Sequence, residues 1–337
     1  MHLAGMTQAA LTAWAKERGA TDGAAQALAR HLLASFAGRD TGAQPARALL
    51  AEAATFVRDL PAAEAVPDAD GTVRFALTLP DGNIVEAVLI AQAGRDTVCV
   101  SSQVGCARGC VFCETGRLGL LRNLSAAEIV AQYAVARRYA SANGRRVPQN
   151  VVFMGMGEPL DNLDEVVRAI DVLREPSGFA VPERRITVST VGIVPRLAEL
   201  FARTKANVAV SLHAIDEGER RALLPVARRW PLEELRAALA AAPRPVLLQW
   251  TLIDGVNDSF AHADKLAEFA RGLEVRVNLI PLNAGPRKDQ AAPPLAHCRA
   301  FQKRLADLGV RTLLRLPHGQ GASGACGQLA GSRRLKC

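Results

Sequence analysis

The chain has 337 residues, 49% of them hydrophobic, and no apolar run reaches the ~18 residues that a membrane-spanning helix requires. Its formal net charge of +8 favours a polyphosphate partner, whereas an aromatic content of 4% argues against an extended base-stacking platform. Seven cysteines, an odd number, and the lack of a signal-peptide pattern argue against a disulfide framework and against export, so we expect a protein of the reducing cytoplasm that does not bind a membrane.

The N-terminal residues predict a small helical domain. Leu28, Leu32 and Phe36 recur every four residues within an Ala-rich stretch that runs from Thr7 to Leu60, and this spacing places them on one helix face. The polar residues 61–71 that follow predict a linker.

A β-hairpin is predicted after this linker. Residues 73–79 and 84–90 are rich in apolar and β-branched side chains, and the four residues between them, Pro80-Asp81-Gly82-Asn83, are typical of a turn.

Strands and helices alternate along the rest of the chain. Strands are predicted at Thr97–Ser101, Asn150–Met154, Ile186–Ser189, Asn207–Leu212, Val246–Leu252, Val275–Ile280 and Thr312–Leu316. Helices are predicted at Ser125–Tyr139, which begins with a capping box, and at Leu163–Arg174, Val194–Arg203, Pro231–Ala241, Ser259–Arg271 and His297–Leu308. About six βα units are too few to close an eight-stranded barrel, so the expected fold is α/β, a partial (β/α)6 TIM-like barrel.

Four regions follow from this pattern. We expect an N-terminal helical accessory domain at residues 1–62, a linker and β-hairpin at 63–95, the partial barrel at 96–318, and a C-terminal loop with a basic tail at 319–337.

Three closely spaced cysteines are the most specific motif. Cys106, Cys110 and Cys113 form a C-x3-C-x2-C pattern, with Phe112 just before the third cysteine. Three thiolates can hold three irons of a [4Fe–4S] cluster and leave the fourth iron open to bind S-adenosylmethionine (SAM). A structural zinc site, with Cys99 as the fourth ligand, is the alternative that this spacing leaves open.

Polar residues and glycines follow successive predicted strands. They are Gly155-Met156-Gly157-Glu158-Pro159 after the second core strand, Ser189 on the third, Ser211-Leu212-His213 on the fourth and Pro281-Leu282-Asn283 on the sixth. Each alone is more often a helix cap or a structural residue. Because barrel sites form at the carboxyl ends of the strands, together they predict one rim above the cysteine motif.

Five motifs in order carry a family resemblance. They are residues 97–106, 119–124, 154–159, 211–213 and 325–331, the last reading Ala-Cys-Gly-Gln-Leu-Ala-Gly. Between Asp70 and Gly331 the chain resembles the RlmN/Cfr family of radical SAM RNA methyltransferases, which implies that the partial barrel is of the radical SAM type.

The resemblance also implies roles for individual residues. It implies that the [4Fe–4S] cluster is bound by Cys106, Cys110 and Cys113, and SAM by Gly157, Glu158, Ser189, Ser211, Leu212, His213 and Asn283. It further implies three catalytic residues: Cys326 as the cysteine that becomes methylated, Cys99 as the second catalytic cysteine, and Glu86 as the proton acceptor.

Methylation of an adenine carbon needs two cysteines besides the cluster ligands. C2 and C8 of adenine are not nucleophiles, whereas a thiolate accepts a methyl group from SAM directly. Reductive cleavage of a second SAM yields a 5′-deoxyadenosyl radical, which removes hydrogen from the S-methyl group so that the carbon adds to the ring. A second thiol then resolves the adduct as a disulfide.

We therefore expect a monomeric radical SAM RNA methyltransferase that acts on C2 of an adenosine in 23S rRNA, and in tRNA, with an electron donor such as flavodoxin or ferredoxin. The alternatives are methylation of C8, a radical SAM enzyme with a non-RNA substrate, and a zinc-stabilised RNA-binding module. The chain departs from the family pattern at Glu114, at Gln249 and Trp250, and at residues 284–288 and 318–324, which leaves the target nucleotide open.

Overall fold

One ten-stranded mixed sheet organises the computed structural model, which describes residues 3–40, 45–54, 60–92, 94–283 and 289–330. Its strands, in spatial order, are β1 (Ala62–Pro67), β2 (Val73–Thr78), β3 (Ile84–Gln92), β4 (Arg95–Cys99), β7 (Asn150–Phe153), β8 (Ile186–Thr190), β9 (Asn207–Ser211), β10 (Val246–Leu252), β11 (Val275–Pro281) and β12 (Thr312–Leu314). A separate antiparallel hairpin consists of β5 (Gln103–Cys106) and β6 (Gly119–Asn123).

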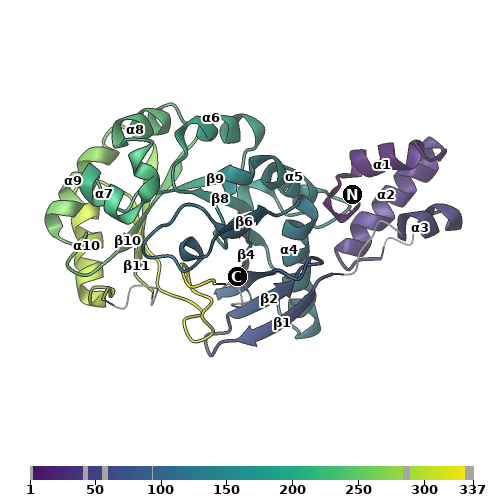
Figure 1. Ribbon diagram of the computed structural model, residues 1–337, viewed down its shortest axis with the longest axis horizontal. Coiled ribbons are helices and arrows are strands. Elements are labelled where there is room, and N and C mark those ends of the chain that lie inside the picture. Colours follow the sequence, from purple (N-terminus) through teal and green to yellow (C-terminus); the bar gives the residue numbers. More distant parts are fainter. Residues whose placement is uncertain (1–2, 41–44, 55–59, 93, 284–288, 331–337) are drawn as a thin grey trace.

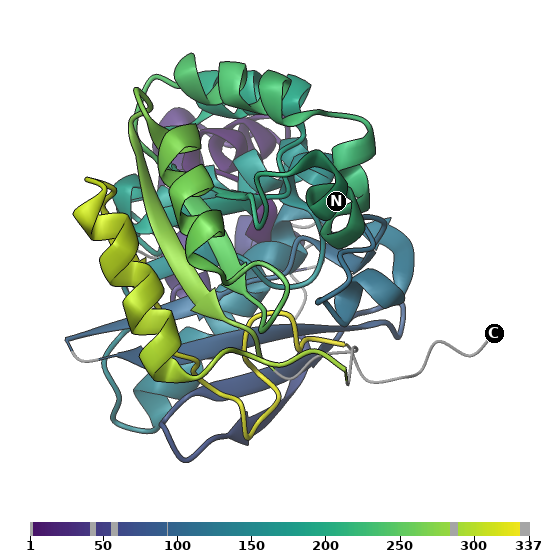
Figure 2. The same ribbon diagram turned by 90° about the vertical axis from the view of Figure 1, so that its left-hand side faces the viewer.

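The seven strands from β4 to β12 in this order run parallel to one another. The helices that connect them are α4 (Ala126–Ala142), α5 (Leu163–Arg174), α6 (Val194–Arg203), α7 (Glu217–Leu223), α8 (Leu232–Ala240), α9 (Phe260–Ala270) and α10 (Leu295–Asp307). These helices lie on the outer side of the curved sheet (Figures 1 and 2). Because β1 and β12 end the strand order without pairing to each other, the barrel is open. The predicted α/β partial barrel is confirmed.

Short-range sequence signals account for these elements. In β10, Leu248, Trp250 and Leu252 are fully buried, and the polar residues that alternate with them are buried too, as expected for a parallel strand covered on both faces. Helix α4 begins with the predicted capping box, in which the backbone N–H of Ser125 donates to Glu128 Oε2 at 2.8 Å.

The N-terminal helices have a hydrophobic core of their own. They are α1 (Gln8–Lys16), α2 (Asp22–Phe36) and α3 (Arg47–Ala54), and they extend to one side of the barrel in Figure 1. Trp14, Leu28 and Leu33 are among the buried residues of this separate cluster. The helices described here are all too short or too polar to cross a membrane.

The sequence predictions missed several elements. Residues 61–71 do not form a simple linker, because β1 occupies Ala62–Pro67 and pairs antiparallel with β2. Its side chains are mostly exposed, so an edge strand held by backbone hydrogen bonds shows no apolar alternation. The β5–β6 hairpin and helix α7 were also not predicted. Five short 3-10 helices complete the described structure, at Leu3–Gly5, Thr115–Arg117, Pro159–Asn162, Glu183–Arg185 and Pro225–Arg228.

Candidate active site

The cysteine motif begins at Cys106, the last residue of β5, and continues on the loop between β5 and β6. Gly105 adopts a φ of +78° beside a bulge in this hairpin, and a Cβ there would lie 1.9 Å from the Gly119 carbonyl oxygen. Only glycine therefore allows the two strands to approach this closely. Helix α7 supports the loop from behind, since Val111 N donates to the Leu223 carbonyl oxygen at 3.1 Å.

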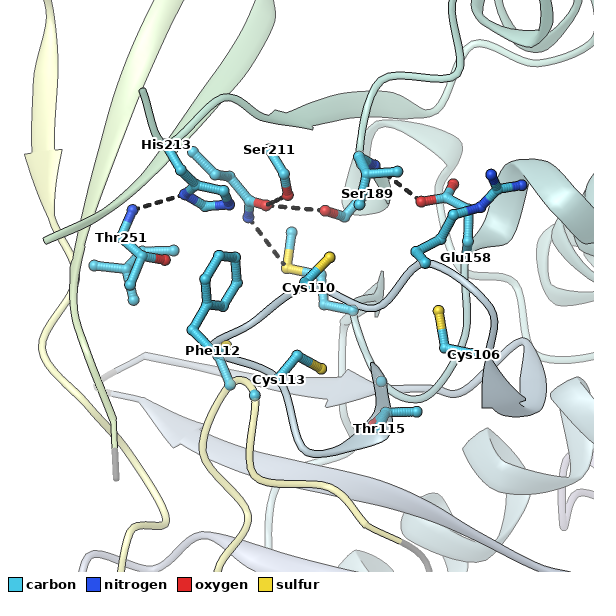
Figure 3. A pocket seen from close by; sticks show the side chains of 18 of the residues that line it. Cys106, Cys110, Phe112, Cys113, Thr115, Glu158, Ser189, Ser211, His213 and Thr251 are labelled. Atoms are coloured by element: carbon cyan, nitrogen blue, oxygen red, sulfur yellow. Dashed lines mark hydrogen bonds between the residues drawn. The ribbon is translucent and has the colours of Figure 1, made fainter. Parts of the chain in front are cut away.

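Cys106, Cys110 and Cys113 line one cavity together (Figure 3). Burial raises the pKa of Cys106 to about 12 and raises the pKa values of Cys110 and Cys113 as well. Such thiols become thiolates when a cationic metal centre offsets their desolvation.

The donor set fits a [4Fe–4S] cluster. Three soft sulfur ligands from one loop surround a common space. Cys326, from the C-terminal segment, also lines this cavity. Within the described ranges, no three Cys, His, Asp or Glu side chains are grouped so that they could hold a single metal ion. Cys99, the fourth ligand of the zinc alternative, does not line this cavity.

The turn after β7 contributes backbone and a buried carboxylate. Gly157 adopts a φ of +101°, and a Cβ there would lie 2.6 Å from Gln103 Cβ, so this position requires glycine. Glu158 lines the cavity, and its two carboxylate oxygens accept hydrogen bonds from the backbone N–H groups of Leu160 and Val191, each at 2.9 Å. Burial raises the pKa of Glu158 to about 7. The carboxylate thus joins the turn after β7 to the turn after β8.

A glutamine that sequence reasoning did not assign to the site connects two predicted SAM residues. The hydroxyls of Ser189 and Ser211 donate to Gln249 Oε1 at 2.9 and 3.4 Å, and Gln249 Nε2 donates to Met154 Sδ at 3.7 Å. All four side chains line the cavity, and the Gln249 network is drawn in Figure 3. Its position in a mostly apolar strand was the available signal, because a buried polar group needs partners.

His213 is buried and neutral. Burial, with a smaller contribution from Arg220, lowers the pKa of His213 to about 3. Its Nδ1 accepts a hydrogen bond from Thr251 N at 2.9 Å, and its ring meets Phe112 of the cysteine loop edge-on at a centroid distance of 4.8 Å. His213 therefore both lines the cavity and braces the loop. Leu212 is fully buried in the hydrophobic core and does not line the cavity.

Cys326 lies where two cavities meet. It lines the cavity of the cluster cysteines and also a second cavity, which contains Cys99. Asn283 lines both cavities, and its Nδ2 donates to the Cys326 carbonyl oxygen at 3.0 Å. Burial, and then the charge of nearby Cys326, raises the pKa of Cys99 to about 12. Both cysteines are free thiols, so the structure contains no disulfide between them.

Glu86 lies outside both cavities. Its buried side chain on β3 forms an ion pair with Arg74 of β2, and its Oε2 accepts a hydrogen bond from Ala330 N at 2.8 Å. The predicted proton acceptor thus contacts the segment that carries Cys326. Sequence reasoning did not single out Arg74.

Two parts of the chain named in the sequence analysis lie outside the described residues. They are residues 284–288, which depart from the family pattern, and residues 331–337, which include Gly331 and the basic tail.

Comparison with known proteins agrees with this geometry. Residues 100–267 match the family model described as the radical SAM superfamily. A probable RNA methyltransferase of Sorangium cellulosum is 44% identical over an alignment of 352 positions, which covers 99% of this chain and 88% of that protein. The dual-specificity RNA methyltransferase RlmN of Syntrophobacter fumaroxidans is 46% identical over 264 residues, 77% of each chain. The crystal structure of a radical SAM methyltransferase from Sphaerobacter thermophilus superposes with a TM-score of 0.90 at 38% identity, covering 98% of this chain and 100% of that one.

Proposed function

Because the chain belongs to the RlmN/Cfr family of radical SAM RNA methyltransferases, which use a [4Fe–4S] cluster and SAM, we propose that it methylates C2 of an adenosine in 23S rRNA and in tRNA. The observation that supports this proposal most directly is the place of Cys326, which borders both the cavity of the cluster cysteines and the cavity of Cys99. A methyl carrier needs access to both. The net charge of +8 suits a polyanionic substrate.

In this proposal the cavity holds both cofactors. Cys106, Cys110 and Cys113 would hold the cluster, and Gly157, Glu158, Ser189, Ser211, His213 and Asn283 would line the SAM site. When bound, the cluster supplies the electron for reductive cleavage of SAM. The buried, neutral His213 and the Gln249 network would keep the cavity wall fixed without adding charge beside the sulfonium group.

The two remaining site cysteines differ in exposure, and this difference suits different roles. Cys326 is exposed and can reach a methyl donor, so its thiolate would form the S–C bond as the sulfonium carbon–sulfur bond breaks. Cys99 is buried with a pKa raised to about 12 and stays a thiol. After the carbon has joined the RNA base, the ring would lose its C2 hydrogen as a proton and its unpaired electron, for which the oxidised cluster would be the acceptor. The Cys99 thiol would then lose its proton as its sulfur attacks the Cys326 sulfur. An S–S bond forms while the S–C bond to the RNA breaks, the released carbon takes up a proton and becomes the methyl group, and a reducing donor regenerates the two thiols.

Mass spectrometry of RNA tests this function. Digested 23S rRNA and tRNA from a strain lacking the gene should have lost 2-methyladenosine at specific positions, and the reconstituted protein should restore it in vitro. Loss of 8-methyladenosine instead would assign the reaction to C8, and unchanged RNA would favour a non-RNA substrate.

For the cell, we further propose a cytoplasmic monomer that receives electrons from a flavodoxin- or ferredoxin-class protein.

A further inference from the structure

One ion pair holds both ends of the segment from Ala322 to Ala330, which carries Cys326. The Arg74 guanidinium contacts Glu86 Oε1 through Nη1. Arg74 Nε also donates to the Ala322 carbonyl oxygen at 2.7 Å, and Glu86 Oε2 accepts a hydrogen bond from Ala330 N at 2.8 Å. Arg74 and Glu86 are together called the clasp below.

The clasp is built into the β2–β3 hairpin. Arg74 faces Val88 across the two strands and Ala76 faces Glu86, so the two clasp residues are diagonal neighbours on one face of the sheet. Their side chains are 21% and 5% exposed, respectively, and the attraction between charges at such a site is screened less than at the surface. Figure 1 shows the C-terminal segment, in yellow, beside this hairpin.

Two carboxylates of the turn before β2 also bind the chain at the start of this segment and just before it. Asp70 Oδ2 accepts a hydrogen bond from Gly319 N at 2.9 Å, and Asp68 Oδ2 accepts one from Ala322 N at 3.1 Å. Both contacts lie before Cys326 in the chain. The hairpin therefore holds the segment at several points upstream of Cys326 and, through Glu86, at one point downstream.

We propose that Arg74 is a positioning residue for the methyl carrier: the clasp places Cys326 between the two cavities, and release of Ala330 from Glu86 lets Cys326 move from the cofactor toward RNA. The proposal rests on the proposed role of Cys326. It also bears on the role of Glu86 as the proton acceptor that the family resemblance implies. While the segment is docked, one oxygen of this carboxylate accepts a hydrogen bond from Ala330 N. In this docked state, Ala330 N therefore competes with any proton donor for this oxygen.

Hydrogen exchange of the anaerobically reconstituted holoenzyme tests the clasp. In Arg74→Met, peptides from residues 319–330 should exchange about tenfold faster, because the hydrogen bond from the charged guanidinium to the Ala322 carbonyl oxygen is lost and Glu86, which still accepts from Ala330, loses its ion pair with Arg74. Exchange in peptides from β10 should stay unchanged. Arg304→Met is the matched control, since Arg304 pairs with Asp264 across two helices at 2.7 Å. Unchanged exchange at 319–330 in Arg74→Met would overturn the proposal.

A second variant covers the case in which Arg74→Met does not fold. Arg74→Lys keeps a positive charge beside Glu86 but replaces the guanidinium fork by a single nitrogen, so exchange should rise near Ala322 more than near Ala330. In Arg74→Lys, S-methylation of Cys326 at saturating SAM should be about tenfold slower than in wild type, and the KM for SAM should be unchanged. Exchange and methylation equal to wild type would again overturn the proposal. The exchange measurement needs neither RNA nor turnover, so it tests the clasp alone. If Cys326 were not the methyl carrier, a separate result would show it, because Cys326→Ala would still methylate RNA.

Discussion

The side-chain amide of Asn283 donates a hydrogen bond to the backbone carbonyl of Cys326 at 3.0 Å, which ties the proposed methyl carrier to the residues that follow β11. Asn283→Ala removes this bond, and S-methylation of Cys326 should slow about tenfold, since small displacements of reacting atoms are costly. Intact-protein mass spectrometry measures the rate. Asn207→Ala removes a comparable amide at the amino end of β9, whose Nδ2 donates to the Arg184 carbonyl oxygen at 2.8 Å and which does not line the cavity, and it should match wild type. Equal rates in the two variants would contradict this role of Asn283.

Removing one proposed cluster ligand should abolish cluster binding. Cys110→Ala leaves two thiolates of the motif, so anaerobic reconstitution should yield far fewer than about four irons per chain and little visible absorbance. Cys298→Ala is the control, because Cys298 is fully buried in α10 and lines neither cavity. Full iron content in Cys110→Ala, measured by metal analysis, would remove Cys110 from the ligand set.

Variants of the two cysteines proposed to be catalytic should fail at different steps. Cys326→Ala cannot accept a methyl group, so it should bind its cluster but modify no RNA. Cys99→Ala keeps the exposed Cys326 thiol but lacks the buried thiol that resolves the adduct, so RNA should remain covalently attached to the protein. Denaturing gel electrophoresis of the two reactions with labelled RNA distinguishes these outcomes. Release of methylated RNA by Cys99→Ala at the wild-type rate would refute the disulfide step.

Gln249 should matter for SAM affinity even though the sequence did not single it out as a ligand. Gln249→Leu removes the acceptor that orients Ser189 and Ser211. The two hydroxyls would then no longer be held in the orientation proposed to face SAM, and the loss of hydrogen bonding to the cofactor should cost about 1–3 kcal/mol, or roughly 5- to 150-fold in Kd. Equilibrium dialysis with labelled SAM measures the change. Gln302→Leu, on α10, should leave the affinity unaltered, because Gln302 lines neither cavity.

Glu158 and His213 should give opposite pH dependences of stability. Burial raises the pKa of Glu158 from 4.5 to about 7, so the stability it contributes is complete below pH 4.5 and is lost as pH rises through 7. Burial lowers the pKa of His213 from 6.5 to about 3, so its contribution is present above pH 6.5 and is lost as pH falls toward 3. Between pH 4.5 and 6.5 the two slopes oppose each other.

Each single variant should therefore reveal the slope of the other residue. In Glu158→Gln the free energy of unfolding should rise from pH 4.5 to 6.5 by on the order of 2 kcal/mol relative to wild type. In His213→Asn, which tolerates the local φ of +61°, it should fall over the same range. Urea unfolding of the cluster-free proteins measures both slopes. Parallel curves for wild type and Glu158→Gln would show that Glu158 does not titrate in this range.

The sequence by itself determined the elements that depend on local pattern. The C-x3-C-x2-C motif, the capping box at Ser125 and helix α5 at Leu163–Arg174 could be predicted because each is encoded within about a dozen consecutive residues. The rule that barrel sites lie at strand ends was enough to predict that Ser189, Ser211 and Asn283 share one rim, and the cavity confirms that they do.

The tertiary structure decided which distant residues act together. Arg74 lies 248 positions from Ala322, and Ser189 lies 60 positions from Gln249; no periodicity connects residues so far apart. The edge strand β1 was missed for a related reason, because its backbone pairs with β2 while its side chains stay exposed. Local periodicity reports which face of an element is buried, whereas backbone pairing and side-chain partners depend on how the chain packs against itself.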